Sequence, residues 1–248
     1  MTEGFMDFRP KRVHFPRPGW NFHTIASVIL LLLWLPFYLT GGSGGSLSDW
    51  YLILGLSREG LLEESQIWSL ATYPLLHGNF VHWLTNAFFI FYFGGRLHSI
   101  FGEREVWRTA GWASLAGGLG HLIFQGNSPL VGASAIGMGF FVAVTTVSPE
   151  SKMFPLPLRA RNLRNGVILG SFIMLLMIPS LKVPIFSELG TIVVEQGGTS
   201  LLMIGHACHL GGALAGVLVM RKYFAKPITL AQLRKERAAR EIDEDQAA

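Results

Sequence analysis

The sequence predicts an all-α membrane protein, a bundle of six transmembrane helices with its N- and C-termini in the cytoplasm. Three observations predict it: the composition, the spacing of apolar blocks, and the distribution of basic residues. The chain has 248 residues, of which 50% are hydrophobic and 15% are charged, and its mean hydropathy is +0.40. Ordinary soluble domains carry about 25% charged residues. This chain is therefore too apolar for a solvated globule.

Six apolar blocks have lengths that suit membrane spans. A spanning helix needs roughly 20 apolar residues, because each residue rises about 1.5 Å through a core about 30 Å thick. The predicted spans are Phe22–Thr40, Phe80–Ile100, Val106–Phe124, Ser134–Ser148, Asn165–Ile178 and Thr199–Tyr223. The chain then divides into a basic segment at 1–21, a six-span domain at 22–223 and a charged tail at 224–248, with both end segments in the cytoplasm.

The basic residues support this count. With six spans and a cytoplasmic N-terminus, all 20 Lys and Arg residues except Arg58 and Lys182 fall in segments on the cytoplasmic side. This is the distribution that the positive-inside rule describes. The net charge of +4 is explained by anionic lipid headgroups, so we expect a lipid bilayer as partner and no nucleic acid. Pro36 and a Gly/Ser stretch at 41–46 argue against a cleaved signal peptide in the first block.

The fourth block is short and begins with a hydroxyl side chain. From Ser134 it runs for about 15 residues, or roughly 22 Å, which cannot cross the hydrocarbon core. We therefore expect residues 126–132 to descend into the protein, lining a polar cavity. Ser134 would then lie below the outer surface at a helix N-terminus, where backbone N–H groups and the helix dipole can stabilise an oxyanion.

Two further spans carry polar side chains toward the same leaflet. His209 is expected about ten residues into the sixth span, and the Gly212–Gly216 spacing allows that helix to pack closely against another. Such packing would bring the Ser134 hydroxyl within reach of the imidazole. His82 and Asn86 are four residues apart, so they share one face of the second span and can both donate hydrogen bonds to a developing negative charge.

Together these residues resemble the rhomboid intramembrane serine proteases. The resemblance rests on His82…Asn86, on Gly132-Ala133-Ser134-Ala135, and on Cys208-His209-Leu210-Gly211-Gly212 with Gly216, and it covers about residues 68–223. It implies a serine endopeptidase with a Ser134–His209 dyad in a water-filled cavity open to the outside. His82, Asn86 and the Ser134 backbone N–H would hold the oxyanion. The partners would be transmembrane protein substrates, cut within their membrane segments without a metal or cofactor.

Three departures from the family pattern stand out. Ala135 follows the serine where many relatives have Gly, and His98 stands where many have Glu. Met138 occupies the place of an aromatic ring that packs on the catalytic imidazole, and a polarizable Met can still pack there. Met138, His77 and His206 are expected to support the site rather than to react.

Other chemistries fit the residues less well. A membrane metalloprotease would show His-Glu-x-x-His, which is absent from the sequence. The Asp residues all lie outside the predicted spans, which argues against an aspartyl protease. Cys208, the only cysteine, is expected to be a buried packing residue. Two alternatives remain: a catalytically inactive rhomboid-fold protein that binds transmembrane segments, and a transporter that uses buried His residues.

The remaining expectations concern access and location. The outer connection at 182–198, with its Pro and Gly residues, is expected to form a mobile gate together with the fifth span. We expect a multi-pass integral membrane protein of a bacterial inner membrane.

Overall fold

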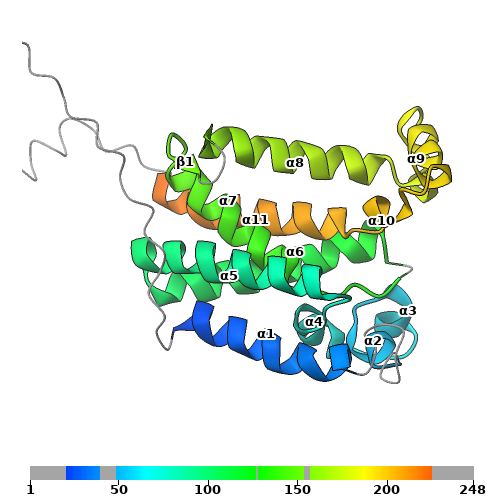
Figure 1. Ribbon diagram of the computed structural model, residues 1–248, viewed down its shortest axis with the longest axis horizontal. Coiled ribbons are helices and arrows are strands. Elements are labelled where there is room, and N and C mark those ends of the chain that lie inside the picture. The colour runs from blue at the N-terminus through cyan, green and yellow to red at the C-terminus, as the bar shows by residue number, and fades with distance from the viewer. Residues whose placement is uncertain (1–20, 40–48, 127, 154–156, 225–248) are drawn as a thin grey trace, which may run out of the picture.

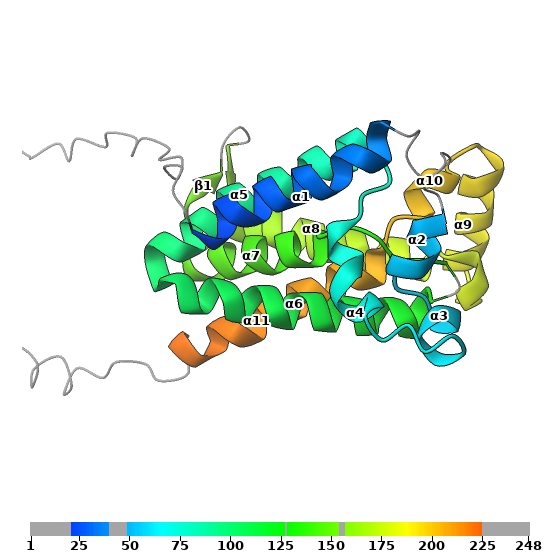
Figure 2. The ribbon, with the colours of Figure 1, turned by 90° about the horizontal axis from the view of Figure 1, so that it is seen from below.

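Six helices run lengthwise through the molecule in the computed structural model, which describes residues 21–39, 49–126, 128–153 and 157–224 (Figures 1 and 2). They are α1 (Phe22–Leu39), α5 (Phe80–Phe101), α6 (Glu103–Phe124), α7 (Ser134–Val147), α8 (Ala160–Leu176) and α11 (His206–Phe224). The ends of the chain, at 1–20 and 225–248, lie outside the described residues, as do most of the two predicted cytoplasmic segments.

Shorter elements gather at one end of the long helices (Figure 1). They are α2 (Asp49–Leu54), α3 (Arg58–Leu62), α4 (Ser69–Thr72), η2 (Tyr73–Leu75), η3 (Pro179–Leu181), α9 (Phe186–Glu195) and α10 (Thr199–Leu202). The opposite end carries a small antiparallel pair, β1 (Lys152–Met153) and β2 (Leu158–Arg159). We call the end with the shorter helices the cavity end, because a cavity of about 1180 Å³ opens there.

The helix α7 lies at the centre and is short and apolar on all sides. Its residues from Gly137 to Thr145 are all buried. It packs against α5, α6, α8 and α11, and a helix that is hydrophobic all round is stable only when surrounded in this way. Small residues permit the close approach, since a methyl group at Gly216 of α11 would lie 2.5 Å from the Gly139 carbonyl oxygen.

The mainly helical architecture agrees with the sequence prediction. The helices α1, α5 and α7 begin at Phe22, Phe80 and Ser134, the residues at which apolar blocks were expected to begin. In the described part of the chain, none of the helices is both long and apolar enough to qualify as a candidate membrane span.

Two expectations near the C-terminal part of the chain were wrong. The block Thr199–Tyr223 is not one helix, because residues 203–205 separate α10 from α11. His209 therefore lies in the first turn of α11, not about ten residues into a helix. Most of the connection at 182–198, which was expected to form a mobile gate, is the helix α9.

Candidate functional site

A cavity of about 1180 Å³ opens at the cavity end and collects most of the candidate residues. Its lining includes His82 and Asn86 of α5, Ser134 and Met138 of α7, and His209 of α11. Much of the remaining lining comes from the end of α6, the segment before α7, η3 and residues 202–205. His77 and His206, the other two candidates, do not line it.

Ser134 begins α7 directly after a tight turn. Gly132 has φ +109, a backbone conformation that residues with side chains rarely adopt. Its N–H donates to the Tyr73 carbonyl oxygen at 2.9 Å, and Leu130 exchanges backbone hydrogen bonds with Leu56 at 2.8 and 3.0 Å. Leu130 and Ala133 are buried, so the descent of this segment into the protein is confirmed for the residues that the structure describes.

The side chain of Cys208 lies behind Ser134. Its thiol lies near the hydroxyl groups of Ser134 and Tyr73, close enough for a polar interaction with each, and it is fully buried. The Tyr73 hydroxyl donates in turn to the Ser114 carbonyl oxygen at 2.7 Å. The prediction of a buried packing residue is confirmed, but the polar contact with Ser134 was not expected from the sequence.

His209 is half-buried and faces the cavity from the first turn of α11. Its backbone N–H donates to the Gly205 carbonyl oxygen at 2.9 Å. The neighbouring ring of His206 lies 6.2 Å away between ring centroids. However, the Nε2 atom of His206 lies 2.8 Å from the Leu201 carbonyl oxygen. The His206 side chain therefore connects α11 to α10, which is a structural role.

Residues His82 and Asn86 line the cavity from α5, as expected for residues on one face. The side-chain oxygen of Asn79 accepts from the His82 N–H at 2.9 Å and caps the helix. A methyl group at Gly132 would lie 2.5 Å from His82 Nε2 and 3.2 Å from Asn86 Nδ2, so both groups lie against the turn before Ser134. Asn86 Nδ2 is buried and makes no hydrogen bond with the described residues, which leaves a donor available.

His77 lies behind His82 rather than in the cavity. The two rings meet edge to face, with 5.2 Å between centroids. His77 is fully buried, and burial, together with the neighbouring His82, lowers its pKa to about 3. Its carbonyl oxygen accepts from the Tyr51 hydroxyl at 2.7 Å. Burial raises the pKa of Tyr51, so both side chains stay neutral at physiological pH.

Sequence reasoning missed Gln125, whose side chain forms hydrogen bonds with the backbone at the break between α10 and α11. Its side-chain nitrogen donates to the Ile204 carbonyl oxygen at 3.2 Å, and its side-chain oxygen accepts from the Ala207 N–H at 3.0 Å. The amide therefore replaces helical hydrogen bonds that are lost where the chain leaves α10. Its only signal in the sequence is its place directly after the predicted end of the third block.

The departures at Ala135 and His98 have visible consequences. Ala135 is fully buried, and its methyl group points to α6, where a methyl group at Gly117 would lie 2.5 Å from it. It does not line the cavity. His98 Nε2 lies 3.3 Å from a Glu103 carboxylate oxygen, so the two side chains connect the end of α5 to the start of α6.

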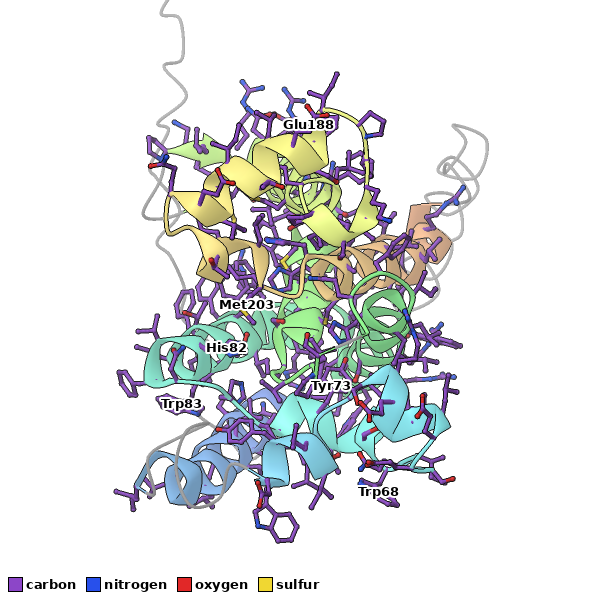
Figure 3. The ribbon with its side chains drawn as sticks, turned by 90° about the vertical axis from the view of Figure 1, so that its right-hand side faces the viewer. Trp68, Tyr73, His82, Trp83, Glu188 and Met203 are labelled. Atoms are coloured by element: carbon purple, nitrogen blue, oxygen red, sulfur yellow. The ribbon has the colours of Figure 1, made fainter. Side chains whose placement is uncertain are left out.

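Figure 3 shows the cavity end with His82, Tyr73 and Met203 near its middle and Glu188 of α9 at its upper edge. Within the described ranges, no group of three or more His, Cys, Asp or Glu side chains is arranged so that it could hold a metal ion. The arrangement offers a hydroxyl, two imidazoles and an unoccupied amide donor around one cavity.

Comparison with known proteins shows similarity to one protein family. The Rhomboid domain matches residues 64–226. The chain is also 25% identical over 154 residues to "Rhomboid-like protein 11, chloroplastic" of Arabidopsis thaliana, a match that covers 62% of this chain and 51% of the plant protein. The chain thus spans about half the length of that relative. Rhomboid family members are integral membrane proteins, generally intramembrane serine proteases, with some inactive members. Because the family match covers more than half of its length, the chain belongs to the rhomboid family.

Proposed function

We propose that this protein is an intramembrane serine endopeptidase that cleaves transmembrane segments of other membrane proteins. The observation that carries the proposal is the shared cavity, which is lined by Ser134, His209, His82 and Asn86 from three different helices. A nucleophile, a base and oxyanion donors are the groups that acyl transfer needs.

In the first step, the Ser134 oxygen attacks the scissile carbonyl carbon while His209 accepts the hydroxyl proton. The C–N bond then breaks, and His209 returns the proton to the leaving amine, which leaves an ester on Ser134. A water molecule, deprotonated by His209, attacks this ester and releases the new carboxyl terminus. The proton returns to the Ser134 oxygen, so the enzyme is restored.

The oxyanion would be held by three donors: the His82 imidazole, the Asn86 side-chain amide and the Ser134 backbone N–H. The first N–H groups of a helix have no partner within the helix, so that of Ser134 is available. In other hydrolases, loss of one such donor costs about 10²–10³ in rate. Residue Gly132 serves this arrangement by letting His82 and Asn86 approach the turn before α7.

The proposal also includes how the protein would lie in the membrane. The six long helices would be the spans, with both termini in the cytoplasm and the cavity end on the outer side of a bacterial inner membrane. A cavity of about 1180 Å³ accommodates several residues of an unwound substrate segment. Met138 would pack beside the imidazole, and His77 would support His82.

A catalytically inactive rhomboid protein is the second candidate, favoured by the Ala135 and His98 departures. The Ala135 methyl group points away from the cavity, and the His98–Glu103 pair lies at the opposite end of α5. Neither departure removes a group from the cavity, so the protease proposal has the stronger support.

A fluorophosphonate probe tests the proposal most directly, because it forms a covalent bond only with an activated hydroxyl. We expect labelling of the parent protein in membranes, loss of labelling in Ser134→Ala, and normal labelling in the control Ser99→Ala, whose side chain lies at the far end of α5. The same Ser134→Ala variant should lose cleavage of a transmembrane substrate by about a millionfold. Unchanged labelling or cleavage in Ser134→Ala would contradict the proposal.

A further inference from the structure

The helix α9 crosses the cavity end instead of running along the bundle (Figures 1 and 2). Its orientation is fixed by one buried face. The Ser187 hydroxyl donates to the Ile178 carbonyl oxygen at 3.2 Å and accepts from the Val183 N–H at 2.8 Å. Gly190 lies directly against the Met177 carbonyl, with no room for a side chain. These contacts determine which residues of α9 face outward.

The outward face of α9 is divided into an apolar and a polar stripe. Leu189 and Ile192 lie one turn apart on α9 and are 47% and 52% exposed, and Ile185, the residue directly before the helix, is 68% exposed. Beside them the exposed polar stripe consists of Glu188, Thr191 and Glu195. We call the three apolar side chains the α9 stripe. An exposed apolar stripe beside a polar one is typical of a helix that lies at a membrane surface.

The start of the α9 stripe is held in a strained conformation. Ile185 has φ +67 and ψ −52, and the Phe186 N–H donates to the Pro184 carbonyl oxygen at 2.7 Å. This is a γ-turn of the rare kind, and for a β-branched residue it costs about 1–3 kcal/mol. The strain places a large apolar side chain outward, where it has little protein contact. A favourable contact outside the chain would offset this cost.

We propose that the α9 stripe binds the lipid surface, so that α9 is an interfacial helix in the outer leaflet of the bilayer. The inference rests on the proposed membrane setting, in which the long helices run through the bilayer. The helix α9 crosses their direction, so in that setting it would lie roughly in the membrane plane. Residues Phe186–Glu195 include two Glu and no Lys or Arg. The contact therefore depends on burial of apolar area and not on attraction to anionic headgroups.

This contact would set the position of the cavity rim. The helix α9 packs against η3 and α10, and Leu181 of η3 and Leu202 of α10 both line the cavity. A helix held at the lipid surface therefore fixes both elements relative to the membrane. The inference concerns membrane contact only and is independent of whether Ser134 is a nucleophile.

Site-directed labelling tests the proposal in the full chain reconstituted in phosphatidylcholine vesicles. Single cysteines would be introduced by Ile192→Cys and Leu189→Cys, with Thr191→Cys and Glu188→Cys as matched neighbours on the polar stripe. Each would carry a fluorophore, and lipids with a quencher on the acyl chain would report depth. The parent protein serves as the blank, because its Cys208 is fully buried.

We expect quenching at positions 189 and 192 to exceed that at 188 and 191 by about twofold or more, because only the stripe reaches the acyl chains. Raising the salt concentration, or adding anionic lipid, should leave this difference unchanged. Equal quenching on both stripes would overturn the proposal. The proposal would also be overturned if positions 189 and 192 became less accessible to the lipid quencher as the protein density in the vesicles rises. A second copy of the chain would then be the partner.

Discussion

The α-carbon of Gly212 in α11 lies directly against the backbone carbonyl of Ala135 in α7, and no side chain fits between them. A methyl group at position 212 would lie 2.9 Å from the Ala135 α-carbon and closer still to its oxygen. Ala135 follows Ser134, and Gly212 lies one turn after His209. The contact between these two backbones therefore sets how closely the candidate nucleophile and base approach each other.

The first prediction concerns this contact. Gly212→Ala should separate α7 from α11, because the new methyl group meets backbone atoms that cannot rotate away. We expect a loss of about 1–3 kcal/mol in unfolding free energy and a large fall in substrate cleavage. Thermal unfolding in detergent and a cleavage assay would measure the two effects.

The matched control is Gly170→Ala on α8, where a methyl group meets nothing within 4 Å. Alanine favours a helix by about 1 kcal/mol over glycine, so this variant should be as stable as the parent or more stable. If Gly212→Ala were as active and as stable as Gly170→Ala, close packing of α7 and α11 would not be what holds the site together.

The sequence was sufficient for those parts of the site that depend on local rules. A span too short to cross the membrane indicated a buried helix start at Ser134, and the four-residue spacing of His82 and Asn86 predicted a shared face. Both inferences use only helix geometry. The structure agrees, because the three side chains line one cavity.

Contacts between distant segments could not be predicted in this way. Apolar residues continue through Met203 and Ile204, so hydropathy gave no sign of the break before α11. The break is held by Gln125, which comes from a different helix end. The thiol of Cys208 likewise meets Tyr73 and Ser134 only after the chain has folded. Such partners depend on tertiary packing, which has no local pattern.

The second prediction concerns the turn before Ser134. Gly132→Ala adds a methyl group 2.5 Å from His82 Nε2, at a residue with φ +109. We expect the proposed oxyanion donors to be displaced and the turnover rate to fall about 10²-fold, comparable to loss of one donor. Steady-state kinetics would measure this. Gly111→Ala, where the methyl group meets nothing within 4 Å, should keep the parent rate, and equal rates for both variants would contradict the prediction.

The third prediction separates the two imidazoles of α11. His209→Ala should abolish cleavage, since His209 lines the cavity and His206 does not. His206→Ala should lose the contact with the Leu201 carbonyl oxygen, lowering stability by about 1 kcal/mol while retaining most of the turnover rate. Cleavage rates and unfolding temperatures of both variants would be compared. Equal loss of turnover from both would reopen the question of which ring is the base.

The fourth prediction tests whether the Cys208 thiol positions Ser134. Cys208→Ala removes the polar contact with the hydroxyl, and the loss of about 1 kcal/mol from one hydrogen bond corresponds to a several-fold fall in turnover rate. Cys208→Ser restores a donor and should lie closer to the parent. If both variants lost activity only in proportion to their unfolding temperatures, the thiol would serve packing alone.

The fifth prediction is a dependence of stability on pH that originates at His77. Its pKa is about 3 in the folded protein and about 6.5 in an unfolded chain. Between these values the unfolded state binds a proton that the folded state does not, so stability falls as the pH drops below 6.5. The slope for one such group is at most about 1.4 kcal/mol per pH unit. Unfolding followed from pH 7 to pH 4 should show a shallower slope in His77→Gln than in the parent, because glutamine does not titrate. Parallel slopes would mean that His77 takes up its proton without unfolding the protein, and that its burial against His82 is not maintained at low pH.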